Sequence, residues 1–328
     1  MDMPQAPELD GRVVVSNVDR LHKAAGRRSH APLVPLFPRA FRKMQFDDVD
    51  AVIISHHAAA IAAAHATDKP TLAYVHSPAR WAWDPEMRRG EADGIAGRSA
   101  LAALATLIRR NEASAAPKIT AIVANSNVVR DRIRQWWHRD ANVIHPPVNT
   151  DYYTPGSDTA REDFFLLAGR LVPYKRPELA VAAAERAGVR LVVAGDGRMA
   201  AACHALAGPK IEFLGRVSDE EMLSLQRRAR ALLMPGIEDF GIVPVEAMAC
   251  GTPVIAVGAG GALDSVIPRL SGEFVPAGSD TLVVEGFEKA LRQFDDSTYD
   301  TSAIRKHAES FSREQFRHQM RQAVESLL

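Results

Sequence analysis

Residues 231–261 read ALLMPGIEDFGIVPVEAMACGTPVIAVGAGG, which predicts a strand, a glycine-bearing loop, a short helix and a second strand. Pro235 and Gly236 break the first apolar run. Pro244 suits the first turn of a helix, where a missing N–H costs nothing, and Gly251 suits the helix end. The apolar run VIAV that follows has the composition of a buried strand. This order of elements is typical of an open α/β sheet.

Two acidic side chains, Glu238 and Glu246, flank the expected helix start. A helix N-terminus after a loop of small residues offers free N–H groups and the positive end of a dipole, which together bind phosphate. Carboxylates are poor phosphate ligands, but they accept hydrogen bonds from hydroxyl groups. Phosphate-binding and hydroxyl-binding groups side by side indicate a site for a sugar nucleotide.

The totals limit the classes of protein that the chain can be. Its 328 residues suffice for two domains, and 47% hydrophobic with 24% charged residues is ordinary for a globular protein. Forty basic and forty acidic residues give a net charge of zero, which argues against nucleic acid as the main partner. Cys203 and Cys250 are too few for a disulfide framework or a zinc site and fit the core of a cytoplasmic protein. The polar segment 1–11 has no signal-peptide character.

A linker is expected at HPPVNTDYYTPGSDTARED, residues 145–163, because its Pro, Gly, Asn, Asp and Thr content is typical of loops. Short apolar strands alternate with helical patterns on both sides, which indicates parallel sheets covered on both faces. Ligands bind such sheets at the carboxyl ends of the strands. The predicted division is an incomplete N-terminal domain at 1–147, a linker at 148–163, a nucleotide-sugar-binding domain at 164–308 and a terminal helical segment at 309–328.

Individual elements follow from the same patterns. Strands are expected at 12–16, 51–55, 71–76, 121–125 and 142–145 in the first half and at 164–168, 190–194, 211–214, 231–234 and 254–257 in the second. Helices are expected at 177–187, 198–207, 219–228 and 244–250. Residues 17–48 are expected to form a long irregular segment, and the first sheet is expected to lack elements at its front.

Two cations follow the first strand of the second half, in LLAGRLVPYKRPELAV, residues 166–181. The strand ends at Gly169, and Arg170 and Lys175 lie in the loop. Arginine makes forked contacts with phosphate and lysine acts as a point charge, so the pair could hold a diphosphate. The alternative is two solvated surface charges. The phosphate-binding stretch on the same sheet favours the first interpretation.

Two further loops are weaker candidates. Gly195 lies in VVAGDGR, where a simple tight turn is as plausible as a ligand contact. In EFLGRVSDEEM, residues 212–222, the strand ends near Arg216 and Val217, whose backbone could line a pocket for a base. Ser218 three residues before Glu221 is a capping-box pattern, which accounts for both residues structurally.

These segments, in this order, resemble the retaining GT-B glycosyltransferases of the largest bacterial family, which includes sugar-nucleotide-dependent mannosyltransferases. The signature of that family is a glutamate, seven residues, a second glutamate and Ala-Met-Ala-x-Gly-x-Pro-Val, seen here as Glu238, Glu246 and AMACGTPV. The resemblance runs from about residue 30 to the end and is strongest at 164–261. It implies the α/β class and two doubly wound, Rossmann-like domains facing across a cleft.

The resemblance also implies roles for individual residues. Glu238 would contact hydroxyls of the donor sugar, and Glu246 would accept hydrogen bonds from the ribose. Arg170 and Lys175 would neutralise the departing diphosphate, where charge develops in the transition state, so no metal or other cofactor is expected. The amides expected to meet the diphosphate or the sugar belong to Gly241, Ile242 and Val243. The remaining expected nucleotide contacts are Gly169, Gly195, Arg216 and Val217.

The first half matches the mannosyl- and rhamnosyltransferase members at PTLAYVHSPARWAWDP, residues 70–85. His76 ends a strand there and is expected to hydrogen-bond the donor sugar or the acceptor. Trp81 and Trp83 allow two interpretations, apolar packing or stacking on a sugar face. His56-His57 is not expected to bind metal, because adjacent side chains on a strand point to opposite faces. The resemblance also implies that the terminal helical segment crosses back to the first domain.

The chain departs from the family pattern at its front, where no Gly-Gly-x-Glu-like loop precedes Asp50. The hypothesis is a retaining hexosyltransferase that moves mannose from GDP-mannose to a glycan or glycolipid acceptor of the cell envelope. It would work in the cytoplasm, with a peripheral contact to the inner face of the membrane left open. Two alternatives remain: a truncated, non-catalytic nucleotide-sugar-binding protein, and a sugar-nucleotide epimerase of the same fold.

Overall fold

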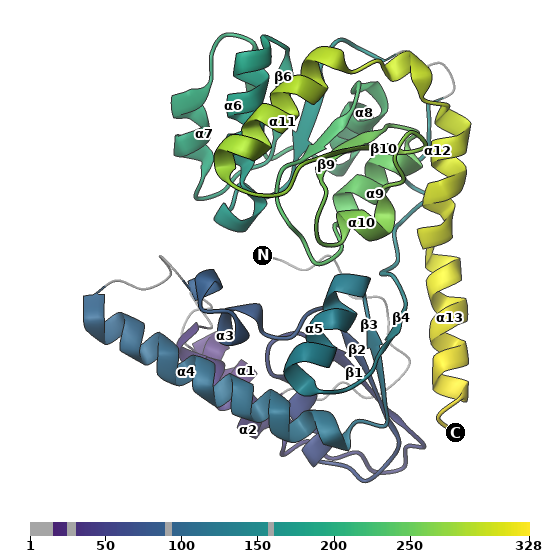
Figure 1. Ribbon diagram of the computed structural model, residues 1–328. Coiled ribbons are helices and arrows are strands. Elements are labelled where there is room, and N and C mark those ends of the chain that lie inside the picture. Colours follow the sequence, from purple (N-terminus) through teal and green to yellow (C-terminus); the bar gives the residue numbers. More distant parts are fainter. Residues whose placement is uncertain (1–15, 25–30, 89–93, 157–160) are drawn as a thin grey trace. The chain divides into compact units, whose positions relative to one another are not determined.

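The computed structural model describes residues 16–24, 31–88, 94–156 and 161–328. The chain folds as two compact units (Figure 1). Unit 1 comprises residues 1–123 and 132–141 with the last two residues of the chain, and unit 2 comprises residues 124–131 and 142–326. Residues 12–15 of the strand expected at 12–16 lie outside the described part of the chain, while Ser16 precedes a helix.

The sheet of the first half has four strands in the order β1-β2-β3-β4. Their bounds are β1 Val52–His56, β2 Thr71–Val75, β3 Ala121–Ala124 and β4 Asn142–Val143, so the strands expected in these four regions are confirmed. β1 and β2 are parallel, with Val52 opposite Thr71. β2 is buried along its whole length, whereas Ile53 and Ser55 of β1 are exposed.

The helices described in the first half are α1 (Asn17–Ala24), α2 (Phe37–Phe41), α3 (Arg80–Trp83), α4 (Gly94–Ala115) and α5 (Asn127–Trp137), with short 3-10 helices at Ala31–Leu36, Ala60–His65, Glu86–Arg88 and Ala116–Lys118. The prediction of an irregular segment at 17–48 is therefore wrong, since α1 and α2 lie within it. α1 suits its dipole, with Asp19 in its first turn and Lys23 in its last, joined by a 2.7 Å ion pair. Both helices are shorter than the window over which apolar periodicity can be recognised in a sequence.

Unit 2 contains a six-stranded parallel sheet with the order β10-β9-β8-β5-β6-β7. The strands are β5 Phe165–Ala168, β6 Leu191–Ala194, β7 Ile211–Gly215, β8 Leu232–Met234, β9 Val254–Val257 and β10 Gly272–Val275. The chain moves outward from β5 through β6 to β7, then returns to lay β8 on the other side of β5. Such a reversal opens a crevice at the carboxyl ends of the two strands between which it occurs, here β5 and β8.

Helices cover both faces of this sheet (Figure 1). α6 (Pro177–Ala187), α7 (Ala200–Leu206) and α11 (Asp280–Gln293) pack together on one face. α8 (Asp219–Arg228), α9 (Ile242–Ala249) and α10 (Ala262–Ser265) group on the other, and α12 (Thr301–Ala308) and α13 (Arg313–Glu325) follow. The helices expected at 177–187 and 219–228 are confirmed to the residue, and the α/β class with doubly wound topology holds. The helix expected at 198–207 is shorter at both ends.

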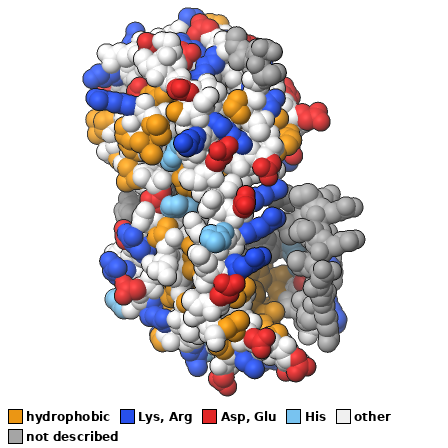
Figure 2. All heavy atoms as spheres, turned by 90° about the vertical axis from the view of Figure 1, so that its right-hand side faces the viewer, with side chains coloured by type: hydrophobic (Ala, Val, Ile, Leu, Met, Phe, Trp, Pro, Cys, Tyr) orange, Lys and Arg blue, Asp and Glu red, His pale blue; other side chains and the backbone are white. Residues whose placement is uncertain are grey.

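Burial and surface character agree with the composition. Phe164, Phe165 and Leu166 are fully buried in the core of unit 2. Cys203 and Cys250 are buried free thiols, as expected. Burial raises the pKa of Cys203 to about 11 and that of Cys250 to about 12, so both are protonated. Figure 2 shows basic and acidic side chains interspersed on one face. No helix in the described part of the chain has the length and apolar character to span a bilayer.

The capping residue identified from sequence gives a first prediction. The Ser218 hydroxyl accepts a 3.1 Å hydrogen bond from the Glu221 backbone N–H at the start of α8. We expect Ser218→Ala to lower the free energy of unfolding by about 1 kcal/mol, measured by urea denaturation. Ser302→Ala, at an exposed position in the first turn of α12, is the control and should change it by less than about 0.5 kcal/mol. Equal effects of the two substitutions would contradict the capping assignment.

Candidate functional site

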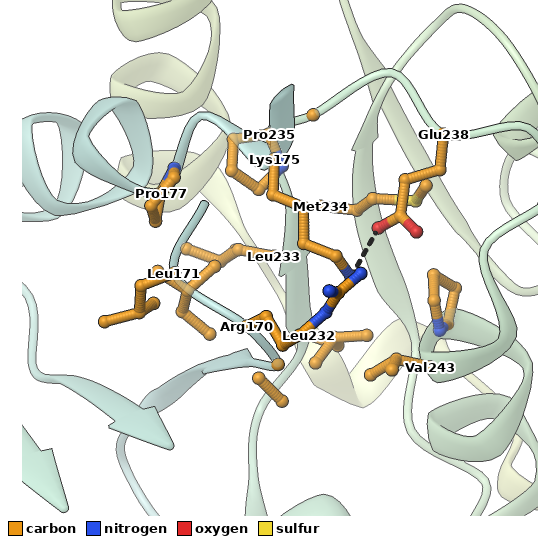
Figure 3. A pocket seen from close by; sticks show the side chains of 15 residues that line it. Arg170, Leu171, Lys175, Pro177, Leu232, Leu233, Met234, Pro235, Glu238 and Val243 are labelled. Atoms are coloured by element: carbon orange, nitrogen blue, oxygen red, sulfur yellow. Dashed lines mark ion pairs between the residues drawn. The ribbon is translucent and has the colours of Figure 1, made fainter. Parts of the chain in front are cut away.

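A pocket opens at the carboxyl ends of β5 and β8, where the strand order reverses (Figure 3). Its apolar floor consists of residues from the two strands and the start of α6. Its polar wall comes from the loop after β5 and the loop after β8. Of the residues that the sequence predicted at the site, Gly169, Arg170, Lys175, Glu238 and Val243 line the pocket.

An ion pair joins the two loops across this pocket. Lys175 Nζ lies 2.9 Å from Glu238 Oε1, and the two side chains are only 18% and 20% exposed. Figure 3 shows the charged ends of Arg170 and Lys175 directed toward the same side of the pocket as the Glu238 carboxylate. An attraction between partly buried charges is screened less than one on the surface. The pair therefore fixes a cation and a hydrogen-bond acceptor next to each other.

The loops can meet only because glycine lies at their contacts. A Cβ atom on Gly195 would stand 1.8 Å from the Gly169 carbonyl oxygen, and Gly195 has a φ of +152°. A Cβ atom on Gly236 would stand 2.6 Å from Lys175 Cα. Neither approach leaves room for a side chain. The loops after β5, β6 and β8 thus pack backbone against backbone at one edge of the sheet.

Arg170 lies at the exposed side of the pocket. Its Nη2 donates a 3.0 Å hydrogen bond to the Tyr174 hydroxyl, which holds the guanidinium along the loop. The neighbouring Arg176 adopts a left-handed conformation with φ of 50° and forms an ion pair with Asp280 at 2.5 Å. Its charge is therefore directed toward Asp280 and not toward the pocket. Tyr174 was missed in the sequence, because a tyrosine before a lysine in a loop carries no signal of its own.

The N-terminus of α9 faces the same region. Gly241 occupies the N-cap position with φ of +88°, and no side chain among the described residues caps the helix there. Val243 lines the pocket, and Ile242 is exposed. The backbone N–H groups of the first turn are the positive end of the helix dipole and suit an anionic ligand.

Glu246 lies further along α9, outside the lining of the pocket, and is half-buried. Its pKa is raised to about 7, mainly by burial and in part by the charge of Asp219, while hydrogen bonds from the Gln226 and Tyr153 side chains and the charge of Lys175 oppose the shift. Burial, and then the charge of Glu246, raise the pKa of Tyr153, so this hydroxyl is a hydrogen-bond donor near neutral pH. Sequence reasoning did not single out Tyr153 or Gln226.

Arg305 on α12 holds the segment that carries Tyr153. Its Nη1 donates to the backbone carbonyls of Thr150 at 2.7 Å, Tyr153 at 2.6 Å and Ala249 at 3.1 Å. The last of these carbonyls belongs to the C-terminal turn of α9. One guanidinium therefore ties the segment before residue 156 to the helix that bears Glu246.

The weaker sequence candidates lie on the neighbouring strand ends. Gly195 follows β6, and its N–H donates a 2.7 Å hydrogen bond to the carbonyl of Gly215 at the end of β7. Arg216 is exposed and Val217 is half-buried. Gly195, Arg216 and Val217 all lie outside the lining of the pocket in Figure 3, although they share the carboxyl edge of its sheet.

His76 belongs to unit 1, where it directly follows β2. Its Nε2 lies 2.9 Å from the Ser55 hydroxyl on β1, and its ring meets Tyr74 edge to face. Burial, followed by the charges of His57 and His56, lowers its pKa, so the neutral imidazole is favoured. His56 is buried and His57 is exposed, as the strand alternation predicted. In the described part of the chain, no three His, Cys, Asp or Glu side chains gather as metal ligands.

Two family models from known proteins match separate halves of the chain. The family Glycosyltransferase Family 4 matches residues 3–152, and Glycosyl transferases group 1 matches residues 157–307. Each half of the chain therefore resembles a glycosyltransferase family. The first match begins nearer the N-terminus than residue 30, from which the resemblance was expected to run.

Individual curated relatives match only part of the chain. The D-inositol 3-phosphate glycosyltransferase of Mycolicibacterium smegmatis is 35% identical over 47% of this chain and 38% of its own. The corresponding protein of Mycobacteroides abscessus is 35% identical over 41% of this chain and 35% of its own. The chain therefore matches less than half the length of these curated relatives.

Solved structures share the fold across most of the chain. Anabaena HepE in complex with UDP has a TM-score of 0.66 at 18% identity, covering 90% of this chain and 82% of its own. Sucrose-phosphate synthase from Thermosynechococcus elongatus has a TM-score of 0.68 at 21% identity, covering 92% and 79%. The predicted GT-B fold is confirmed.

The raised pKa of Glu246 gives a prediction about stability. Its folded-state pKa of about 7 lies above the ordinary 4.5, so the free energy of unfolding falls as the pH rises through that interval. Glu246→Gln removes this titration, and we expect the variant to gain up to about 3 kcal/mol relative to wild type across the interval. Urea denaturation near both limits of the interval measures the change.

Glu212→Gln is the control for this measurement, because Glu212 is an exposed glutamate of the same unit. Its difference from wild type should stay nearly constant between the two pH values. A constant difference for Glu246→Gln as well would contradict the assigned titration.

Proposed function

We propose that the protein is a retaining hexosyltransferase that transfers mannose from GDP-mannose to a glycan or glycolipid of the cell envelope. The observation that carries the proposal is the Lys175–Glu238 pair, set beside Arg170 and the N-terminus of α9 at a strand-order reversal. Phosphate-binding groups and a sugar-binding carboxylate thus share one pocket. We place the reaction in the cytoplasm, with a peripheral membrane contact where the acceptor is a lipid.

The chemistry uses charge on the leaving group. As the bond between the anomeric carbon and the diphosphate oxygen breaks, negative charge grows on that oxygen, where Lys175 and Arg170 stabilise it. The same oxygen takes the proton of the incoming acceptor hydroxyl, whose oxygen bonds to the anomeric carbon on the same face. Configuration is thereby retained, and these side-chain cations with the helix dipole supply the positive charge that a metal would otherwise provide.

Two carboxylates and a histidine orient the reactants in this proposal. Glu238 accepts hydrogen bonds from hydroxyls of the donor sugar, and Lys175 fixes its position. Glu246 accepts from the ribose, for which its ionised form is the better acceptor. His76, held neutral by burial, hydrogen-bonds the sugar or the acceptor.

The identity of the donor is the finest part of the proposal. The resemblance of residues 70–85 to mannosyl- and rhamnosyltransferases supports mannose. The structural neighbour from Anabaena was solved with UDP, which makes UDP-sugars the competing donors to test. The relatives named D-inositol 3-phosphate glycosyltransferase suggest a phosphorylated polyol as a further acceptor to include.

Removing either member of the ion pair should abolish most of the activity. We expect Lys175→Ala and Glu238→Ala each to lower kcat/KM for transfer at least about a hundredfold, because each removes an interaction with the reacting groups. The measurement is product formation with a matched acceptor, after circular dichroism has shown that the variants are folded.

Lys210→Ala and Glu212→Ala are the matched controls, because both side chains are exposed and lie at the amino end of β7, away from the carboxyl ends of the strands where the pocket lies. They should retain transfer within about twofold. Full activity of both Lys175→Ala and Glu238→Ala would overturn the assignment of the site.

A panel of nucleotide sugars tests the donor. GDP-mannose at a hundred times its dissociation constant should stabilise the folded protein by about 2.7 kcal/mol in a thermal-shift assay. At the same concentration, the rise in Tm should be larger with GDP-mannose than with UDP-glucose or UDP-N-acetylglucosamine. A larger shift with a UDP-sugar would replace the proposed donor. Conversion of the nucleotide sugar to its epimer without an acceptor would identify an epimerase instead.

A further inference from the structure

A buried glutamate in unit 1 gathers donors from three separate segments. Glu112 lies on α4 with no solvent exposure. Its Oε1 faces the Ala79 backbone N–H at 2.9 Å and His56 Nε2 at 3.3 Å. Its Oε2 faces the indole N–H groups of Trp83, at 2.5 Å, and Trp137, at 3.1 Å.

All four of these partners are donors. His56 Nδ1 accepts a 3.1 Å hydrogen bond from the Ile61 backbone N–H, so the ring hydrogen is on Nε2, where it faces Glu112. A carboxylate offers about four lone-pair positions, and four N–H groups therefore match its capacity. Satisfied buried networks of this kind hold their members in one arrangement.

The partners come from parts of unit 1 that are far apart in the sequence. His56 is the last residue of β1, and Trp137 is the last residue of α5. Ala79 directly precedes α3, the helix after β2, and Trp83 is the last residue of that helix. The rings also pack on one another: His56 meets Trp137 edge to face at 5.4 Å between centroids. Trp83 stacks on Trp136 at 5.8 Å. These contacts place Trp83 in packing and leave its indole N–H bound to Glu112.

His76 lies between two of the segments held in this way. Its backbone N–H donates a 3.1 Å hydrogen bond to the His56 carbonyl, and the chain reaches Ala79 three residues later. Both the strand end beside His76 and the segment after it therefore depend on the same carboxylate. We propose that Glu112 is a positioning residue, which fixes residues 76–83 for the transfer reaction; this rests on the proposed function of the site.

The chemistry of the carboxylate makes the proposal specific. Glu112→Gln keeps the size of the side chain but replaces one acceptor oxygen with an NH2 donor. That group would then face N–H donors, leaving buried indole or backbone N–H groups without an acceptor. The nearest relief is movement of the segment after β2, which is anchored by Ala79 and Trp83, while the sheet strands stay paired.

Hydrogen exchange of the full-length protein tests the positioning directly, without reference to activity. We expect Glu112→Gln to raise amide exchange at least about tenfold in peptides covering residues 76–83, with no change in peptides of β3 or of unit 2. Asp140→Asn is the matched control, because it removes a negative charge from an exposed side chain of the same unit and should leave all peptides unchanged. Exchange unchanged at 76–83, or raised throughout unit 1, would overturn the proposal.

Kinetics test whether the position matters for transfer. Glu112→Gln should lower kcat at least about tenfold and leave the KM for the nucleotide sugar within about twofold, because the donor pocket lies in unit 2. In the background of His76→Ala the same substitution should cost less than about twofold, because Glu112 acts through that segment. Equal losses in both backgrounds, or an unchanged kcat, would overturn the positioning role.

The two assays separate this inference from the proposed function. If wild-type protein transfers no sugar, the proposed function fails and with it the role of Glu112 in transfer, whatever the exchange data show. If wild type transfers sugar and Glu112→Gln changes neither exchange nor kcat, only the inference about Glu112 fails. Trp83→Phe, which removes one donor and keeps a ring, should produce a smaller change of the same kind in both assays.

Discussion

The close backbone contact between the loop after β5 and the loop after β8 is the constraint on which the pocket at the ends of these strands depends. The loop after β8 passes Lys175 so closely that a Cβ atom at position 236 would lie 2.6 Å from Lys175 Cα. Only glycine fits there. That approach brings the lysine within 2.9 Å of Glu238. Because the strands end at the same edge, the N-terminus of α9 is directed at the same space. Charge placement in the pocket is therefore a result of backbone packing.

Much of unit 2 could be predicted, because its strands are continuous apolar runs separated by helices with recognisable ends. Lys175 and Glu238 were both expected at the site, but not their ion pair. Whether residues so far apart in sequence meet is decided by β8 lying beside β5, and strand order leaves no local mark in the sequence. Unit 1 was harder, because α1 and α2 are too short to produce a periodic pattern.

Glu112 shows a different limit. A single glutamate on a long helix is expected to face solvent, and nothing in RRNEASAAP distinguishes it. Its burial is explained only by donors from three other segments, each of which has an ordinary local interpretation. The two tryptophans illustrate the point: the sequence left packing and sugar stacking open for Trp83, and its hydrogen bond to a buried carboxylate was neither.

The raised pKa of Glu246 also gives ligand binding a chemical signature. A carboxyl group with a pKa of about 7 is only partly ionised near neutrality. Under the proposed function, a ribose that binds the ionised form of Glu246 draws the remaining fraction into that form, so protons pass from the protein to the buffer with each nucleotide bound. The apparent enthalpy of binding then includes the ionisation enthalpy of whichever buffer accepts those protons. In that proposal, nucleotide affinity and proton release both report on the ionisation of Glu246.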